Sequence, residues 1–393
     1  MTFEDLPRLV AEKNRAVSGA ERLVDSARAR TGSLGRSFLP TLSGEAGAER
    51  FKTGTHDPKS QPYGHLEAKV NVFRGGRDRL EESGRELQIQ AAGADARRTA
   101  AAELAGARSA YWRLVSTREK VRIVVEALEQ NEKTLAVAAR RVSRGLATDT
   151  DRLEFEIHRS QLREERESLT HAALLLEIEL SAALGMPLES KFRTPETVGH
   201  EHDESLLSAP FEPGSHPDAS DMAARGKALG VERLRAGRWW QPELDLYGGY
   251  YLYTLREREY QTRRDRLDKA VGARLNFFLF DGLRSTSEAA ALRLREEGVG
   301  RQRVQRELAL DAEVRVAKED LKHDHELVHY AEERIAQGSK YLARTLDEYE
   351  RGVKNSPDAL GAAQRALSYK MLYADRRRDY QLTKTGLLAL LGR

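Results

Sequence analysis

The side chains with the clearest potential for chemistry are histidines. His325 and His329 stand four residues apart, which would place them on one face of a helix, and His323 is nearby. Two imidazoles at this spacing could hold a transition-metal ion. The chain contains no cysteine, and no carboxylate has a matching geometry to support such a site. The sequence therefore favours solvated histidines and predicts no metal site, and the same interpretation applies to the histidine-containing acidic run at 200–204.

Motifs that would support catalysis are missing from the chain. The sequence contains no P-loop, no G-x-G-x-x-G, no H-E-x-x-H and no nucleophile-elbow pattern. Its 65 basic and 62 acidic residues leave a net charge of only +3, which implies no nucleic-acid partner. We therefore expect no catalytic residues, no cofactor and no enzymatic activity.

The element that organises the chain is a very long helix. Residues 75–145 are mostly polar and contain no proline, and a helix of this length would reach about 100 Å. Towards its far end an apolar residue recurs at every seventh position, which is typical of a left-handed coiled coil. The members of this seam are Leu114, Val121, Leu128, Leu135 and Val142.

The second half of the chain repeats this pattern 207 positions later, with the seam at Leu321, Val328, Ile335, Leu342 and Tyr349. Gly145 maps to Gly352, and the Leu-Gly pair at 184–185 maps to the pair at 391–392. The sequence thus predicts two tandem repeats, 1–192 and 218–393, with a connector at 193–217. In the first repeat we expect an initial helix at 5–29, a long helix at 76–144 and a return helix at 149–185. In the second we expect an initial short helix, a long helix at 282–351 and a return helix at 357–391.

Each repeat also contains a pair of alternating apolar and polar segments, which predicts strands. The expected ranges are 38–51 and 64–74 in the first repeat, and 239–255 and 267–280 in the second. With aromatic residues near the strand ends, this pattern is typical of a barrel with lipid outside and water inside. The alternative is two amphipathic hairpins on a soluble core. It stays open because the first pair has a weakly apolar face, formed by Leu42, Gly44, Ala46 and Ala48.

Membrane-spanning and targeting segments in the sequence limit where the chain can be located. No run of about 18 apolar residues exists, so no transmembrane helix is expected, and the N-terminus lacks the features of a signal peptide. The chain would then be cytosolic, or mature with its leader removed, and the strands favour the second.

Four strands cannot close a barrel, eight would enclose only side chains, and twelve would leave a lumen. A trimer is the smallest assembly expected to conduct solutes.

The order of these elements resembles the TolC family of outer-membrane efflux ducts. The resemblance rests on motifs at the strand openings, the strand-to-helix junctions and the helix turns: Phe38-Leu39-Pro40, Trp240-Gln241-Pro242, 71–77, 278–284, Arg144-Gly145 and Arg351-Gly352. It implies a mainly α fold with β structure. Long antiparallel coiled-coil helices would form an α-barrel, and four strands per chain would contribute to a trimeric twelve-stranded β-barrel.

The resemblance also implies a function. The chain would be the outer-membrane exit duct of a tripartite efflux or type I secretion system, extending into the periplasm. It would be a passive conduit that forms a homotrimer in outer-membrane lipid. Its partners would be a periplasmic adaptor protein and an inner-membrane transporter. The competing interpretation is a soluble coiled-coil scaffold without a membrane barrel.

By the same resemblance, residues around the turns at Gly145 and Gly352 would form a periplasmic gate. The matching positions are Thr150, Asp151, Tyr349, Lys354 and Asp358, whereas Gly361 replaces a further gate aspartate. Asp151 and Asp358 are equivalent under the 207-residue offset, so a trimer would bring six carboxylates to one aperture. Such a ring would favour cations and could bind a blocking divalent ion. The alternative is that both aspartates only stabilise the first turns of their helices.

Overall fold

The computed structural model describes residues 2–51, 59–201, 203–252 and 267–392, which divide into two compact units. The first, here called the helical unit, comprises Met1–Glu21, Asp95–Ala219 and Gln305–Arg393. The second, here called the sheet unit, comprises Arg22–Ala94 and Ser220–Val304. No helix among the described residues is long and apolar enough to cross a membrane.

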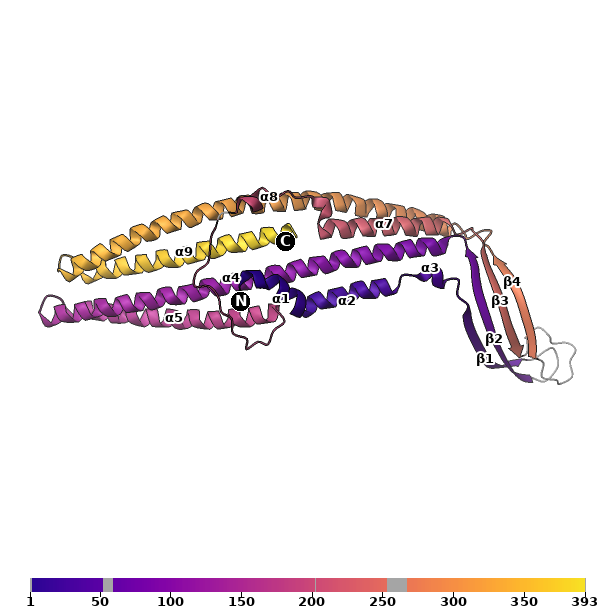
Figure 1. Cartoon of the computed structure of the whole chain (residues 1–393), viewed down its shortest axis with the longest axis horizontal. Helices are drawn as coiled ribbons and strands as arrows, with labels where there is room; N and C mark the ends of the chain where they lie inside the picture. Colours follow the sequence, from indigo (N-terminus) through magenta and orange to yellow (C-terminus); the bar gives the residue numbers. More distant parts are fainter. Residues whose placement is uncertain (1, 52–58, 202, 253–266, 393) are drawn as a thin grey trace. The chain divides into compact units, whose positions relative to one another are not determined.

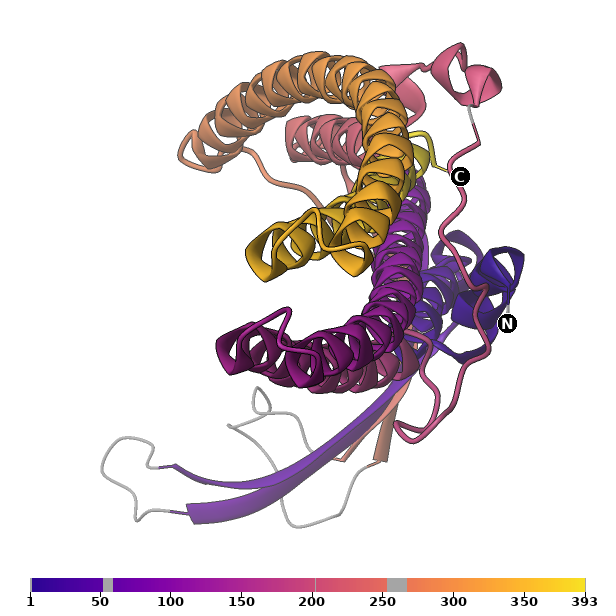
Figure 2. The same cartoon turned by 90° about the vertical axis from the view of Figure 1, so that its left-hand side faces the viewer.

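Two pairs of long helices dominate the chain. The long members are α4 (Arg77–Ser143) and α8 (Arg284–Glu350), with 67 residues each. The return helices are α5 (Asp149–Ala183) and α9 (Ser356–Leu390), with 35 residues each. In the helical unit α4 lies beside α5 and α8 beside α9, as two hairpins (Figures 1 and 2). Both helices of the second hairpin begin and end 207 positions after their counterparts in the first.

The coiled-coil seam lies in the core of the helical unit. Leu114, Leu321, Val328 and Tyr349 are buried, and the remaining seam residues are half-buried. Small side chains on α9 are also buried, at Ala359, Ala362 and Ala366, and Ala359 belongs to a cluster with Ala138 and Phe155 of the first hairpin. The apolar spacing of seven therefore places one face of each long helix against the other helices of this unit.

The predicted initial helix at 5–29 is wrong as a single element. The structure has a 3-10 turn η1 (Phe3–Asp5), then α1 (Leu6–Lys13) and α2 (Arg15–Ala29), with a break at Asn14. The Asn14 side-chain oxygen accepts hydrogen bonds from the amides of Ala16 and Val17, as a helix N-cap does. Its amide nitrogen donates to the Glu103 carboxylate and the Ala183 carbonyl, both at 2.8 Å. These bonds hold the break against α4 and α5.

The connector at 193–217 has secondary structure of its own. It contains α6 (Glu204–Leu207) and the 3-10 turn η2 (Pro213–Ser215), and α7 (Pro217–Gly237) follows. Val198 in the connector and Phe192 just before it are buried against α4 and its neighbours, and Leu206 is buried against α8 and α9. The connector is therefore part of the core of the helical unit.

The sheet unit contains a four-stranded antiparallel sheet in the order β1-β2-β3-β4 (Figure 1). Its strands are β1 (Thr41–Phe51), β2 (Lys59–Arg74), β3 (Glu243–Leu252) and β4 (Leu267–Asn276). The short helix α3 (Ser33–Arg36) precedes β1. Within the described residues β1 and β4 are the two edges of the sheet.

Several predicted strand ends are wrong. β1 begins at Thr41 and not at 38, β2 begins at Lys59 and not at 64, and β3 begins at Glu243 and not at 239. β4 ends at Asn276, which pairs with Glu243, the first residue of β3. The apolar run at 277–280 continues the sequence pattern but has no strand partner, and it is exposed. Residues 253–255 of the predicted range lie outside the described residues.

The register confirms that the sheet has one apolar and one polar face. Leu42, Ala68, Gly248 and Val271 form one cross-strand row, and their side of the sheet carries exposed apolar residues: Leu42, Leu66, Leu246, Tyr250, Val271 and Leu275. On the opposite side the Lys69 ammonium lies 2.8 Å from the Asp245 carboxylate. There the Arg274 guanidinium also lies 4.8 Å from the centre of the Tyr247 ring.

Candidate functional site at the hairpin turns

The two turns that end the hairpins have the same backbone geometry. Gly145 (φ +71°) and Gly352 (φ +84°) both adopt the left-handed conformation. The amide of Leu146 donates to the Arg141 carbonyl, and the amide of Val353 donates to the Glu348 carbonyl, each at 2.9 Å. These are Schellman turns at positions 207 residues apart, and both lie at one end of the helical unit (Figure 1).

Asp151 caps the helix that leaves the first turn. Its carboxylate accepts the Thr148 amide at 2.8 Å and the Thr148 hydroxyl at 2.9 Å, while the Thr148 hydroxyl accepts the Asp151 amide. The bond from the Thr148 backbone is the main cause of a lowered pKa for Asp151, and the Ser356 hydroxyl and the Arg141 charge add to it. Asp151 is therefore ionised at neutral pH.

Asp358 occupies the matching place after the second turn. Asn355 is the N-cap here, and its side-chain oxygen accepts the Asp358 amide at 3.0 Å. The Asp358 carboxylate lies 3.9 Å from the Lys354 ammonium, and both side chains are 43% exposed. The Asp151 carboxylate thus serves the first turn of its helix, whereas the Asp358 carboxylate stays partly exposed beside Lys354.

Tyr349 joins the two hairpins instead of lining an open surface. Its side chain is buried, its ring lies 5.8 Å from the Phe155 ring of α5, and its hydroxyl is 3.4 Å from the Ser356 hydroxyl. The Arg141 guanidinium lies 4.6 Å from the ring centre and donates to the Tyr349 carbonyl at 2.7 Å. A cation over an aromatic face that also makes a charged hydrogen bond is a strong local contact.

The structure therefore brings some of the predicted gate residues together and leaves others apart. Asp151 and Tyr349 both interact with Ser356, whereas Asp358 pairs with Lys354 and Thr150 is exposed. The sequence interpretation missed Arg141 and Phe155. A basic residue in the last turn of α4 was visible in the sequence, but the partner of Arg141 on α8 was not.

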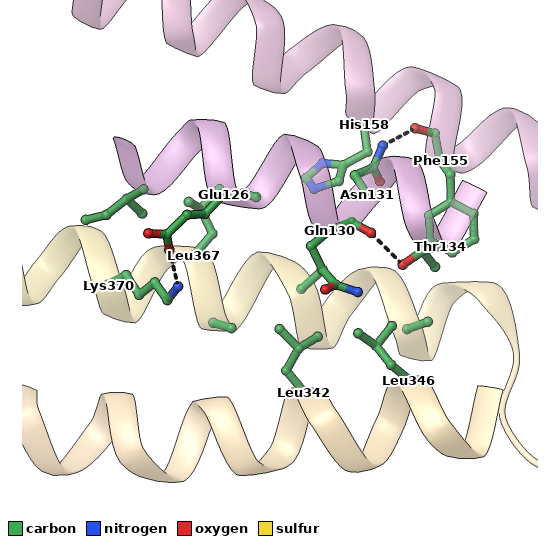
Figure 3. Close-up of a pocket in the computed structure, with 15 residues that line it drawn as sticks. Glu126, Gln130, Asn131, Thr134, Phe155, His158, Leu342, Leu346, Leu367 and Lys370 are labelled. Atoms are coloured by element: carbon green, nitrogen blue, oxygen red, sulfur yellow. Dashed lines mark hydrogen bonds and ion pairs between the residues drawn. The ribbon is translucent and has the colours of Figure 1, made fainter. Parts of the chain in front are cut away.

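A cavity of about 280 Å³ lies behind the turns, between the two hairpins (Figure 3). Asn131 and His158 line it from the first hairpin, and Leu342 and Leu346 line it from α8. Burial lowers the pKa of His158, so its imidazole is neutral. Packing between the hairpins is thus close at the turns, where Tyr349 is buried, and incomplete behind them, where the cavity lies.

Comparisons with known proteins agree with this architecture. The chain is similar to the outer membrane protein VceC from Vibrio cholerae, at a TM-score of 0.80 and 16% identity, over 99% of this chain and 96% of VceC. It is similar to CusC at a TM-score of 0.82 and 15% identity, over 99% of this chain and 91% of CusC. Its similarity to the outer-membrane channel OprN has a TM-score of 0.79 and 16% identity, over 99% and 89% of the two chains. At such identities these structures show the shared fold.

No curated protein matches the chain in sequence. The sequence profile of one family, described as outer membrane efflux protein, matches residues 6–186 and 215–393, which is most of the chain. The two matched segments contain both long-helix hairpins and all four strands described above. The chain therefore belongs to the outer membrane efflux protein family.

Proposed function

We propose that three copies of this chain form the outer-membrane exit duct of a tripartite efflux or type I secretion system. Membership of the efflux family makes the chain an outer-membrane channel protein and not an enzyme. The duct would be a passive conduit, supplied by an inner-membrane transporter through a periplasmic adaptor. The observation that carries the trimer is the sheet, which is incomplete in one chain.

Two properties of the sheet support closure by further copies. Its edge strands β1 and β4 present unpaired backbone groups, which is costly in a lipid environment unless another strand covers them. Its apolar face is also left exposed in the single chain, with Val271 at 92% and Leu42 at 77%. Joining β4 of one chain to β1 of the next would satisfy the edges, and the apolar face would then contact lipid.

Disulfide cross-linking between the two edges tests this closure. Within one chain β1 and β4 are three strand spacings apart, about 14 Å, whereas a disulfide requires Cα atoms within about 7 Å. The double variant Leu42→Cys/Val271→Cys can therefore cross-link only between chains. Mild oxidation should give a covalent trimer on a non-reducing gel, with the β4 cysteine moved along the apolar side to Lys269, Ala273 or Leu275 to find the register between chains.

The matched control places both cysteines on neighbouring strands. Ala68 and Gly248 face each other across β2 and β3, so Ala68→Cys/Gly248→Cys should cross-link within one chain and run as a monomer. A trimer product supports the proposed duct. If the control forms and no edge pair cross-links in any register, the edges do not meet and the trimeric barrel is wrong.

We further propose that the turns at Gly145 and Gly352 form the gate of this duct. They are counterparts in the two repeats, 1–192 and 218–393, that we infer from the 207-residue offset. In a trimer Asp151 and Asp358 would supply six carboxylates to one aperture. The lowered pKa of Asp151 supports a ring that stays charged, and such a ring would favour cations and hold a blocking divalent ion.

Asparagine substitutions separate this charge effect from helix capping. Asp151→Asn/Asp358→Asn keeps an oxygen that can accept the Thr148 amide but removes both charges. We expect a several-fold lower preference for cations over anions in planar lipid bilayers, and loss of any block by divalent cations. Glu167→Gln, an exposed carboxylate on α5 beside Arg166, should leave both properties unchanged. Unaltered selectivity in the double variant would remove these aspartates from the gate.

A further inference from the structure

A cluster of histidines lies on α8 within the helical unit, away from the hairpin turns. His325 and His329 point toward each other, with ring centres 4.7 Å apart and Nε2 atoms 3.2 Å apart. The connector adds His200, whose ring centre lies 6.4 Å from that of His329. The sequence could place only the first two residues on a common face, because His200 is more than a hundred positions away.

The distance between the two Nε2 atoms suits a metal chelate. Imidazole nitrogens bind Zn²⁺ at about 2.0–2.1 Å, so two of them at a tetrahedral angle stand about 3.4 Å apart. The observed separation is 3.2 Å, from neighbouring turns of one helix. Small side-chain rotations would direct both lone pairs at one ion. We propose that His325 and His329 chelate a divalent transition-metal ion such as Zn²⁺, Ni²⁺ or Cu²⁺.

The carboxylate of Glu332 lies close to one of the two proposed ligands, His329. Glu332 Oε2 lies 3.8 Å from Nδ1 of His329, the ring nitrogen that does not face His325. A carboxylate near Nδ1 favours the tautomer with its proton there, which leaves the Nε2 lone pair for the metal. His329 is 59% exposed in the chain, so an ion can reach it from solvent.

The ligand set defines which ions fit. Among the residues that the structure describes, no group of three or more His, Cys, Asp and Glu side chains is arranged to hold a metal. The site is therefore a two-histidine chelate whose other positions are filled by water. Imidazole ligands suit Zn²⁺, Cu²⁺ and Ni²⁺, whereas Mg²⁺ and Ca²⁺ prefer oxygen.

Isothermal titration calorimetry of the untagged full-length chain in detergent, after treatment with EDTA and its removal, tests the site. ZnCl2 and NiCl2 should each bind at one ion per chain, and MgCl2 should not bind. His325→Ala and His329→Ala should each weaken binding at least tenfold, and the double variant should abolish it. Glu332→Gln should weaken it about tenfold, as expected for loss of a carboxylate behind a ligand.

Two further variants act as controls. His323→Ala removes an exposed histidine close in sequence and should bind Zn²⁺ as the unmodified chain does. His200→Ala should retain binding, because both chelating nitrogens belong to α8. The two-histidine chelate is wrong if the unmodified chain gives no saturable binding, if the His325/His329 double variant binds equally well, or if His200→Ala loses as much affinity as His329→Ala. Equal unfolding midpoints in EDTA ensure that the compared variants are folded.

Discussion

Replacing Gly185 by alanine is expected to lower the free energy of unfolding by about 3 kcal/mol or more. Gly185 follows α5 in the left-handed conformation, at φ +65°, which alone costs an alanine about 1–2 kcal/mol. A Cβ atom there would also lie 2.3 Å from the Lys13 carbonyl oxygen, so α1 would have to move. Urea titration of the detergent-solubilised protein, followed by tryptophan fluorescence, measures the loss.

The chain supplies its own control for this substitution. Gly392 stands 207 positions later, follows α9 and has φ +71°. Apart from its adjoining residues, no described atom lies within 4 Å of the Cβ that alanine would add there. Gly392→Ala should therefore cost only the conformational part, about 1–2 kcal/mol. Equal losses for the two variants would mean that the contact with Lys13 does not constrain α5.

These two glycines also illustrate what the sequence could predict. A Leu-Gly pair at the end of an apolar pattern indicates a helix C-terminus, and the same pair in both halves indicates a repeat. No local pattern indicates that one of these glycines packs against the break between α1 and α2. That break depends on Asn14, whose side chain bonds to Glu103 and Ala183. Contacts between distant segments are invisible to a local pattern.

The two faces of the sheet could be predicted from the sequence, whereas several strand ends could not. A period of two assigns each side chain to a face whatever its partner, so the apolar face followed from the alternation alone. The end of a strand depends on how far the neighbouring strand continues to pair with it, and this depends on the register between the two strands. The run at 277–280 kept the apolar pattern, yet β3 offers it no partner beyond Glu243.

At the hairpin turns, positions could be predicted but partners could not. The offset and the family resemblance indicated Gly145, Gly352 and the aspartates that follow them. Arg141 has a glutamate, Glu348, as its counterpart in the second half, so comparison of the two repeats does not point to Arg141 as a contact residue. Its contact with Tyr349 joins two non-equivalent helices, and only the folded chain shows it.

Arg377→Met is expected to lower the free energy of unfolding by about 3–5 kcal/mol, because it leaves a buried carboxylate without its partner. Arg377 on α9 forms an ion pair with Glu119 on α4, and their side chains are only 8% and 9% exposed. Arg377 also donates to the Val198 carbonyl at 3.0 Å, and Glu119 accepts the Val198 amide at 3.3 Å. The pair thus fixes the connector to both hairpins, and urea titration measures its loss.

One heptad further along the same two helices lies a matched control. Lys370 and Glu126 form an ion pair at 2.8 Å, but their side chains are 38% and 61% exposed (Figure 3). Lys370→Met should therefore cost at most about 1 kcal/mol, since water and salt screen an exposed pair. The double variant Glu119→Leu/Arg377→Met should be less destabilised than the sum of its single variants, because no buried charge remains. If Arg377→Met and Lys370→Met lower the free energy of unfolding equally, burial does not determine the strength of these ion pairs. The connector would then be held by the apolar contacts at Phe192 and Val198 instead.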